Sequence, residues 1–159
     1  MTTSLCCTKR NEGPGHLKID EALPEFTLYT ITGQNMSTAD FLGKPSVIVF
    51  FSTTCPDCHK QLPEIQYSYN FNEKLVNFMA IAREEDGIKV QGFWNQAGYT
   101  LPVSAPGTKT LYNLFDRGSG TGVPQLYIAD KNGIIRAFAS DKTLLYAKDI
   151  NVILQELQE

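Results

Sequence analysis

Two kinds of hydrophobic pattern alternate along the chain after about residue 20. A continuous run of β-branched and aromatic residues at Val47–Phe51 is typical of a strand buried on both faces, and a second run, Val76–Ala82, predicts the next strand. A helical pattern follows the first run over Pro56–Tyr69, and a weaker one follows the second run over residues 87–98. This alternation predicts parallel strands joined by helical crossovers.

Shorter elements are predicted on either side of this central part. Phe26–Tyr29 alternates apolar and polar residues before a turn at Thr32–Asn35, as in a strand that enters a hairpin, and residues 37–40 predict one helical turn. The later elements are a strand at 101–103, a helix at 108–115, strands at 125–129 and 134–139, and an amphipathic helix at about 144–157. Asn132-Gly133 between the last two strands favours a hairpin, so the sheet should be mixed and lie between helical layers.

Composition excludes several classes of function. The chain has 159 residues, the size of one domain, and carries 14 Lys and Arg against 17 Asp and Glu, so nucleic acid is not an expected partner. Its longest uninterrupted apolar run, Val47–Phe51, is far too short to span a bilayer. Residues 1–20 predict a flexible leader, and residues 21–159 predict a single domain.

The most specific motif is Cys55-Pro56-Asp57-Cys58-His59, directly after the first buried strand. A CxxC pair can be a redox dithiol, and CxxCH is also the attachment sequence of a c-type haem. At a helix N-terminus the exposed N–H groups and the helix dipole stabilise a thiolate, so Cys55 should have a lowered pKa and attack. Cys58 lies one turn later on the same face and is placed to resolve a mixed disulfide.

The residues beside the two cysteines should tune the pKa of Cys55 in opposite directions. Asp57 carries a negative charge that opposes a neighbouring thiolate, whereas a protonated His59 favours one.

The stretch from Val47 to Pro63 resembles the active-site segment of the thioredoxin superfamily, with a strand, the CxxC pair and a proline five residues after the second cysteine. Gly122-Val123-Pro124-Gln125 ahead of a strand resembles the cis-proline loop of that superfamily. The N-terminal hairpin and the extra segment at residues 84–106 are most similar to the TlpA/ResA type of cell-envelope thiol-disulfide oxidoreductase, related to the AhpC/TSA proteins. The resemblance covers about residues 20–159.

This resemblance implies an α/β thioredoxin fold, with a central mixed β-sheet flanked by helices and an N-terminal hairpin extension. It implies an enzyme of cell redox homeostasis that exchanges disulfides with protein substrates and an upstream thiol partner, needs no cofactor and acts as a monomer. It further implies that the bond before Pro124 is cis and that the backbone of Val123 pairs with a substrate strand.

Three positions depart from the pattern of these families. Thr54 stands where many relatives have Trp, and Val49 stands where thioredoxins have an acidic residue. Gln61 stands where envelope relatives often have Glu. The two carboxylates that usually move a proton to and from the resolving thiol are therefore both missing.

Other chemistries remain as alternatives. Haem attachment would use His59 as an axial ligand, with His16, Met36 or Met79 as the second, but it does not explain the strand before the motif or the Val-Pro pair before a later strand. Structural zinc would require Cys6 and Cys7, which are adjacent and make poor ligands, so no metal site is expected. A thiol peroxidase of the peroxiredoxin type would use Ser52 beside Cys55, and a redox-inactive binding module would leave both cysteines idle.

Two further features of the chain bear on location and on other ligands. The glycine-rich segment 118–122 precedes a proline and a strand rather than a helix, so it predicts a loop and not a phosphate site. The first residues lack the charged and apolar regions of a secretory signal peptide, which leaves a cytoplasmic location open. The family resemblance instead implies the bacterial periplasm or cell envelope. If the sequence begins inside a longer signal, Cys6 or Cys7 is a candidate lipid-attachment site.

Overall fold

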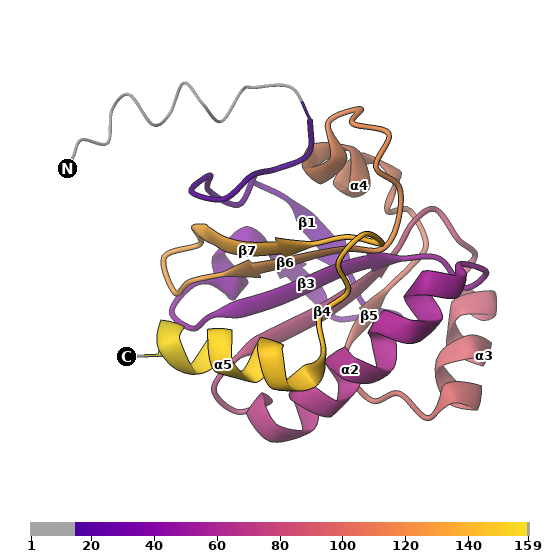
Figure 1. Ribbon diagram of the computed structural model, residues 1–159. Coiled ribbons are helices and arrows are strands. Elements are labelled where there is room, and N and C mark those ends of the chain that lie inside the picture. The colour runs from indigo at the N-terminus through magenta and orange to yellow at the C-terminus, as the bar shows by residue number, and fades with distance from the viewer. Residues whose placement is uncertain (1–14, 159) are drawn as a thin grey trace.

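A five-stranded sheet forms the centre of the computed structural model, which describes residues 15–158 (Figure 1). The strands are β1 (Thr27–Tyr29), β2 (Asn35–Ser37), β3 (Ser46–Phe51), β4 (Asn77–Ala82), β5 (Val103–Ser104), β6 (Gln125–Ala129) and β7 (Ile135–Ala139). The helices are α2 (Pro56–Asn72), α3 (Gly87–Ala97), α4 (Lys109–Asp116) and α5 (Ala147–Leu157), with a 3₁₀ turn, η1, at Thr38–Phe41.

The strand order of the sheet is β5-β4-β3-β6-β7. β3 pairs in parallel with β4 and antiparallel with β6, so that Val49 lies opposite both Ala80 and Leu126. All six residues of β3 are buried, because the strand has a neighbour on each side and a helical layer on each face. This central position explains the uninterrupted apolar run and confirms the predicted mixed sheet.

The two faces of the sheet are covered by different elements. Val47, Val49 and Phe51 pack in the core beneath α2, α3 and α5. Ile48 and Phe50 point to the opposite face, where they pack in the core with residues of η1, α4 and the N-terminal segment. Successive side chains of β3 point to opposite faces of the sheet, so the strand contributes to both halves of the hydrophobic core.

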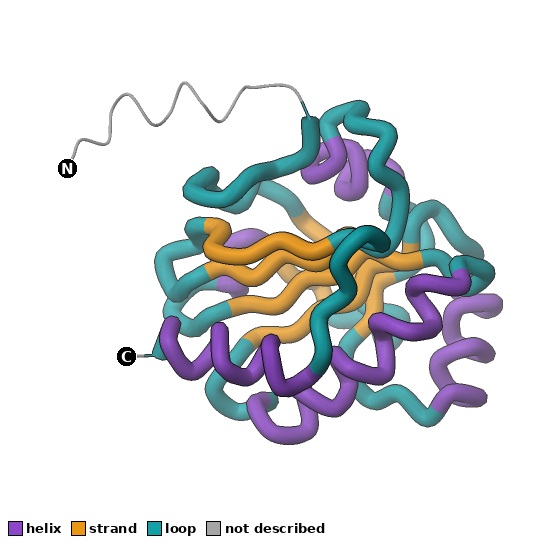
Figure 2. Tube along the Cα trace, in the orientation of Figure 1, coloured by secondary structure: helices purple, strands orange, loops and turns teal. Residues whose placement is uncertain are grey.

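The N-terminal segment contacts both edges of the central sheet. Ala22 bridges to Ile134, the residue before β7, and Thr30 bridges to Ser104 on β5 at the other edge. In Figure 2 this segment runs as a loop along β7 before the chain passes behind the sheet to β1. The β1–β2 pair is the predicted N-terminal hairpin extension.

Some boundaries differ from the sequence prediction. Residues 15–20, assigned to the leader, are attached to the domain: Leu17 is buried, and its N–H donates to the carbonyl of Phe115 (2.7 Å). Residues 1–14, including Cys6 and Cys7, lie outside the described part of the chain. In the β6–β7 hairpin only Gly133 has a left-handed φ (80°) and Asn132 does not, so the turn is longer than a two-residue Asn-Gly turn.

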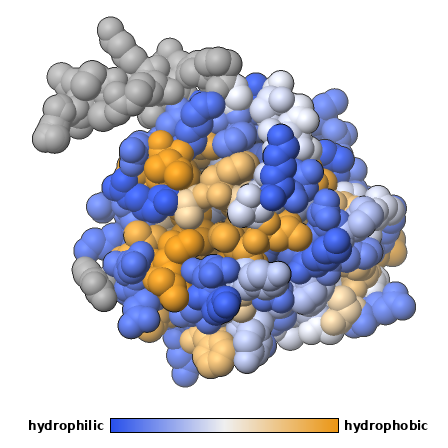
Figure 3. All heavy atoms as spheres, viewed as in Figure 1, coloured by the Kyte–Doolittle hydropathy of each residue, from blue (hydrophilic) through white to orange (hydrophobic). Residues whose placement is uncertain are grey.

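Apolar surface is visible on one face of the domain. Figure 3 shows apolar side chains gathered between the sheet and α5, where Ala137, Leu145 and Ile153 are half-buried at the margin of the core. Among residues 15–158, none of the helices combines the length and apolar character needed to cross a lipid bilayer.

Candidate active site

The two cysteines of the motif lie where β3 passes into α2. Cys55 is the N-cap of α2, Pro56 is the first helical residue, and Cys58 lies in the first turn. Cys55 and Cys58 form a disulfide, with their Cα atoms 5.2 Å apart. The N–H of Cys58 donates to the sulfur of Cys55 (3.1 Å), the kind of contact that stabilises a thiolate at this position.

The sulfurs differ in their access to solvent. Cys58 is completely buried beneath α2, whereas Cys55 is half-buried. A sulfur must be accessible for exchange to occur, and Cys55 is the more accessible of the two.

The loop before β6 lies against the exposed sulfur. The Val123–Pro124 peptide bond is cis, as predicted, and the carbonyl oxygen of Val123 lies 3.6 Å from the sulfur of Cys55. Among the described residues, no acceptor takes the N–H of Val123. A half-buried backbone group beside a reactive sulfur is therefore available to a second chain.

A buried polar network holds this loop in place. Gln125, directly after Pro124, donates to Oδ1 of Asp116 (2.8 Å) and to the carbonyl of Gly122 (2.9 Å). The hydroxyl of Tyr127 donates to Oε1 of Gln125 (2.6 Å), so both ends of the Gln125 amide are engaged. The glycine-rich segment 118–122 thus leads directly into the cis-proline loop.

Thr53 connects three segments around the first cysteine. Its N–H and hydroxyl donate to the two carboxylate oxygens of Glu85 (2.9 and 2.6 Å), and its carbonyl accepts from Nε2 of His59 (2.7 Å). The carboxylate of Glu85 also forms an ion pair with Lys89 (3.7 Å). The backbone at Thr53, which precedes Cys55, is therefore held by Glu85 after β4 and by His59 of α2.

Sequence reasoning missed Glu85. The signal was available in its position, because Glu85 lies just beyond β4, and β4 is parallel to β3. The carboxyl ends of adjacent parallel strands meet at one edge of the sheet, which is where Cys55 lies.

Asp57 and His59, the predicted tuning residues, lie on α2 but turn to other partners. Asp57 forms an ion pair with Lys60 at 3.8 Å. The ring of His59 stacks on Phe93 with centroids 5.2 Å apart, besides its bond to Thr53. Within residues 15–158 neither side chain is hydrogen-bonded to a sulfur, so any influence on Cys55 acts through space or through Thr53.

Gln61, which stands where envelope relatives often carry Glu, is hydrogen-bonded to the backbone of Leu145. Its buried amide donates to the carbonyl of Leu145 (2.8 Å) and accepts from the N–H of the same residue (3.0 Å). Both hydrogen-bonding ends of the side chain are satisfied, so Gln61 joins α2 to the segment that enters α5.

Metal and haem chemistry gain no support from the geometry. Across residues 15–158 there is no group of three or more His, Cys, Asp or Glu side chains arranged to hold a metal ion. The Cys55 and Cys58 sulfurs are bonded to each other.

Comparisons with known proteins agree with this geometry. The model of the AhpC/TSA family matches residues 19–138. ResA of Bacillus anthracis, named as a thiol-disulfide oxidoreductase, is 27% identical over 118 residues, which cover 74% of this chain and 66% of that protein. The chain thus spans just under two thirds of the length of this relative.

Solved structures show the same fold. A thiol:disulfide interchange protein of the thioredoxin family from Chlorobium tepidum superimposes with a TM-score of 0.74 at 22% identity, over 89% of this chain and 99% of that one. The exposed lipoprotein thioredoxin Etrx1 of Streptococcus pneumoniae superimposes with a TM-score of 0.67 at 18% identity, over 84% of this chain and 99% of that one. The predicted thioredoxin fold and the resemblance to the TlpA/ResA type are confirmed.

Proposed function

Because the chain belongs to the AhpC/TSA family, we propose that it is a thiol-disulfide oxidoreductase acting on other proteins through Cys55 and Cys58. The observation that carries this proposal is the Cys55–Cys58 disulfide at the start of α2, whose exposed sulfur lies 3.6 Å from the carbonyl of Val123 in a cis-proline loop. In this proposal the pair, the helix N-terminus and the loop act together in disulfide exchange.

The exchange takes place in two substitutions at sulfur. In the reducing direction the Cys55 thiolate attacks a substrate disulfide, forms a mixed disulfide and releases one substrate thiolate. The Cys58 thiolate then attacks the sulfur of Cys55, closes the internal disulfide and releases the second substrate thiolate. Two electrons pass to the substrate, and an upstream dithiol returns them by the same steps in reverse.

Val123 and Pro124 form the docking element in this proposal. The unpaired N–H of Val123 can bond to an extended substrate segment, as in strand addition, and thereby hold a substrate sulfur beside Cys55. Gln125 and Asp116 support the loop from behind.

The pKa of the Cys55 thiol should lie below its ordinary value, because the Cys58 N–H and the N-terminus of α2 favour the thiolate. Asp57 opposes this shift and a protonated His59 adds to it. Titration of the reduced protein by thiolate absorbance at 240 nm checks the prediction, with Cys55→Ser to assign the signal. His59→Gln should raise the pKa and Asp57→Asn should lower it; an ordinary thiol pKa in the unaltered protein would contradict the first expectation.

The cell envelope is the proposed site of action, with Cys6 or Cys7 as a lipid-attachment position. Support comes from the exposed lipoprotein among the proteins of the same fold and from the TlpA/ResA resemblance. Cell fractionation and intact-mass measurement of the native protein test both parts.

The exchange reaction itself is tested with insulin reduction driven by dithiothreitol. Cys55→Ser should abolish the catalysed rate, because the remaining thiol of the pair, Cys58, is buried and cannot reach a substrate disulfide. Cys58→Ser should also stop turnover but accumulate mixed disulfides on Cys55, which identify the native substrates. Unchanged insulin reduction by Cys55→Ser would sink the proposal, and a faster reaction with hydrogen peroxide than with disulfides would indicate a thiol peroxidase instead.

A further inference from the structure

A half-buried arginine, Arg83, lies beside the docking loop, and no acidic side chain of the described part of the chain pairs with it. Arg83 follows the last residue of β4, and its N–H donates to the carbonyl of Phe51 (2.8 Å), which fixes its backbone next to the start of the Cys55 segment. Among residues 15–158, no carboxylate forms an ion pair with its guanidinium. The guanidinium lies over the ring of Tyr112, whose centroid is 5.5 Å from Cζ.

The guanidinium is directed towards the loop that contacts Cys55. A Cβ atom placed on Gly122 would lie 4.0 Å from Nη1 of Arg83, with no nearer side-chain or backbone neighbour. The next residue, Val123, has its carbonyl 3.6 Å from the sulfur of Cys55. The two residues Gly122 and Val123 thus lie between the guanidinium of Arg83 and the sulfur of Cys55.

Nearby acidic groups do not neutralise this cation. Glu85 is engaged by Thr53 and by Lys89, and Asp116 accepts from Ser119 and Gln125. A guanidinium offers five N–H donors in a planar fork that fits a carboxylate, and partial burial without such a partner is unfavourable.

We propose that Arg83 forms a carboxylate-binding subsite, which selects disulfides that carry an acidic group close to the reacting sulfur. The proposal rests on the disulfide-exchange function and adds a substrate class to it. The chain as a whole has a net charge of −3, so a local cation is needed to attract such a substrate against the field of the protein. Tyr112 holds the guanidinium from behind, and Gly122 leaves the space in front of it open.

The test compares disulfides that differ only in charge. The reduced protein is mixed with 3,3′-dithiodipropionate, which is anionic, or with bis(2-hydroxyethyl) disulfide, which is neutral, and each second-order rate is divided by that of dithiothreitol with the same disulfide. Arg83→Gln should lower the normalised rate with the anionic disulfide about fivefold, as expected for an exposed ion pair at the upper end of its range. The rate with the neutral disulfide should stay within about twofold, and high salt should remove the preference of the unaltered protein.

Two variants and a second substrate pair sharpen the result. Arg83→Lys should retain part of the preference, and Lys109→Gln, which removes an exposed charge from the first residue of α4, should retain all of it. Peptide disulfides with Glu or Gln two residues from the cysteine extend the test to polypeptides. Selectivity with the peptides alone assigns the subsite to acidic protein segments, and selectivity with the small disulfides as well assigns it to any carboxylate.

Equal slowing of both disulfides in Arg83→Gln would overturn the subsite, because it would show that Arg83 acts on the thiolate of Cys55 instead. Unchanged rates with both would overturn it as well. Failure of the unaltered protein to reduce even the neutral disulfide would overturn the exchange function, and the subsite with it.

Discussion

Asp116 is a buried carboxylate behind the docking loop, and its ionisation should matter for stability. Burial acts to raise the pKa of this carboxyl, but hydrogen bonds from Ser119, Gln125 and Tyr112 outweigh burial and lower the pKa below its ordinary value. The ionised group therefore contributes stability above the ordinary pKa of an Asp, and this contribution is lost as the pH falls through the lowered value.

We expect Asp116→Asn to be less stable than the unaltered protein at neutral pH, with the gap closing as the pH falls below about 4. The amide keeps an acceptor oxygen for Ser119 and Gln125 but lacks the charge. Urea unfolding at a series of pH values measures the gap. Asp141→Asn, at an exposed position after β7, is the control and should differ little from the unaltered protein at every pH; a gap for Asp116→Asn that stayed constant to pH 3 would contradict the assignment.

Individual site residues could be predicted from the sequence where a local motif marks them. Cys55 and Cys58 are marked by their spacing after a strand, and Pro124 by its place before one. Glu85 and Arg83 have no local motif, because each reaches the site only through the pairing of β4 with β3. Their position after β4 indicates the edge of the sheet where Cys55 lies, but not which side chains they contact there.

The junction between α2 and α5 depends on two side chains of α2. Gln61 makes two hydrogen bonds to the backbone of Leu145, and Glu64 accepts from the N–H of Ala147, the first residue of α5 (2.7 Å). The end of the long loop after β7 is therefore held by α2 rather than by its own sequence. This explains why α5 begins at Ala147 although the apolar periodicity predicts a start near Leu144.

We expect Gln61→Ala to lower the free energy of unfolding by about 1–2 kcal/mol, since it leaves the half-buried N–H and carbonyl of Leu145 without partners. Chemical denaturation measures this loss. Lys60→Ala, one residue earlier on the exposed face of α2, serves as the matched control and should change stability by less than about 0.5 kcal/mol. Equal losses in both variants would mean that the Leu145 contact contributes little.

The exact ends of some strands could not be predicted from the sequence. β3 was predicted because full burial leaves a continuous apolar run at Val47–Phe51. The strand predicted at residues 101–103 is instead β5 at Val103–Ser104, because Pro102 has no N–H to donate and contributes only its carbonyl, to the N–H of Ala80. The register of a short edge strand thus depends on which of its residues have a backbone N–H to donate.

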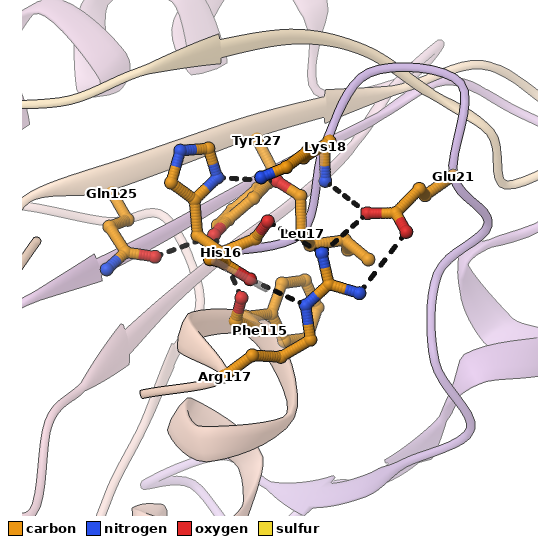
Figure 4. Close-up of polar contacts among 9 residues, drawn as sticks. His16, Leu17, Lys18, Glu21, Phe115, Arg117, Gln125 and Tyr127 are labelled. Carbon is orange, nitrogen blue, oxygen red and sulfur yellow. Dashed lines mark hydrogen bonds and ion pairs between the residues drawn. The ribbon is translucent and has the colours of Figure 1, made fainter. Parts of the chain in front are cut away.

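At the scale of the whole molecule, an ion pair fastens the N-terminal segment to the domain. Figure 4 shows the guanidinium of Arg117, after α4, directed at the carboxylate of Glu21, with bonds of 2.8 and 3.2 Å. Arg117 also donates to the carbonyls of Gly15 and His16. The sequence did not reveal this attachment, because it relies on backbone carbonyls that every residue carries.

We expect Glu21→Gln to cost about 2–3 kcal/mol of stability, because it leaves the charge of Arg117 without its buried partner, which is only 3% exposed. Asp20→Asn is a matched control at the adjacent residue: Asp20 pairs with Arg136 on the surface and should contribute less than about 1 kcal/mol. Thermal and urea unfolding of both variants measure the difference. Equal costs would contradict the role given to burial.

The attachment of the N-terminal segment to both sheet edges also sets an order of events during folding. Leu23 donates to the carbonyl of Gly133, and Ile31 donates to that of Val103, so this segment finds these partners only after residues 103 and 133 have been synthesised. Loop-closure entropy disfavours such distant contacts until the intervening strands have paired. The first described segment to be synthesised is therefore among the last to dock, and until then both margins of the sheet are open to pairing with another molecule.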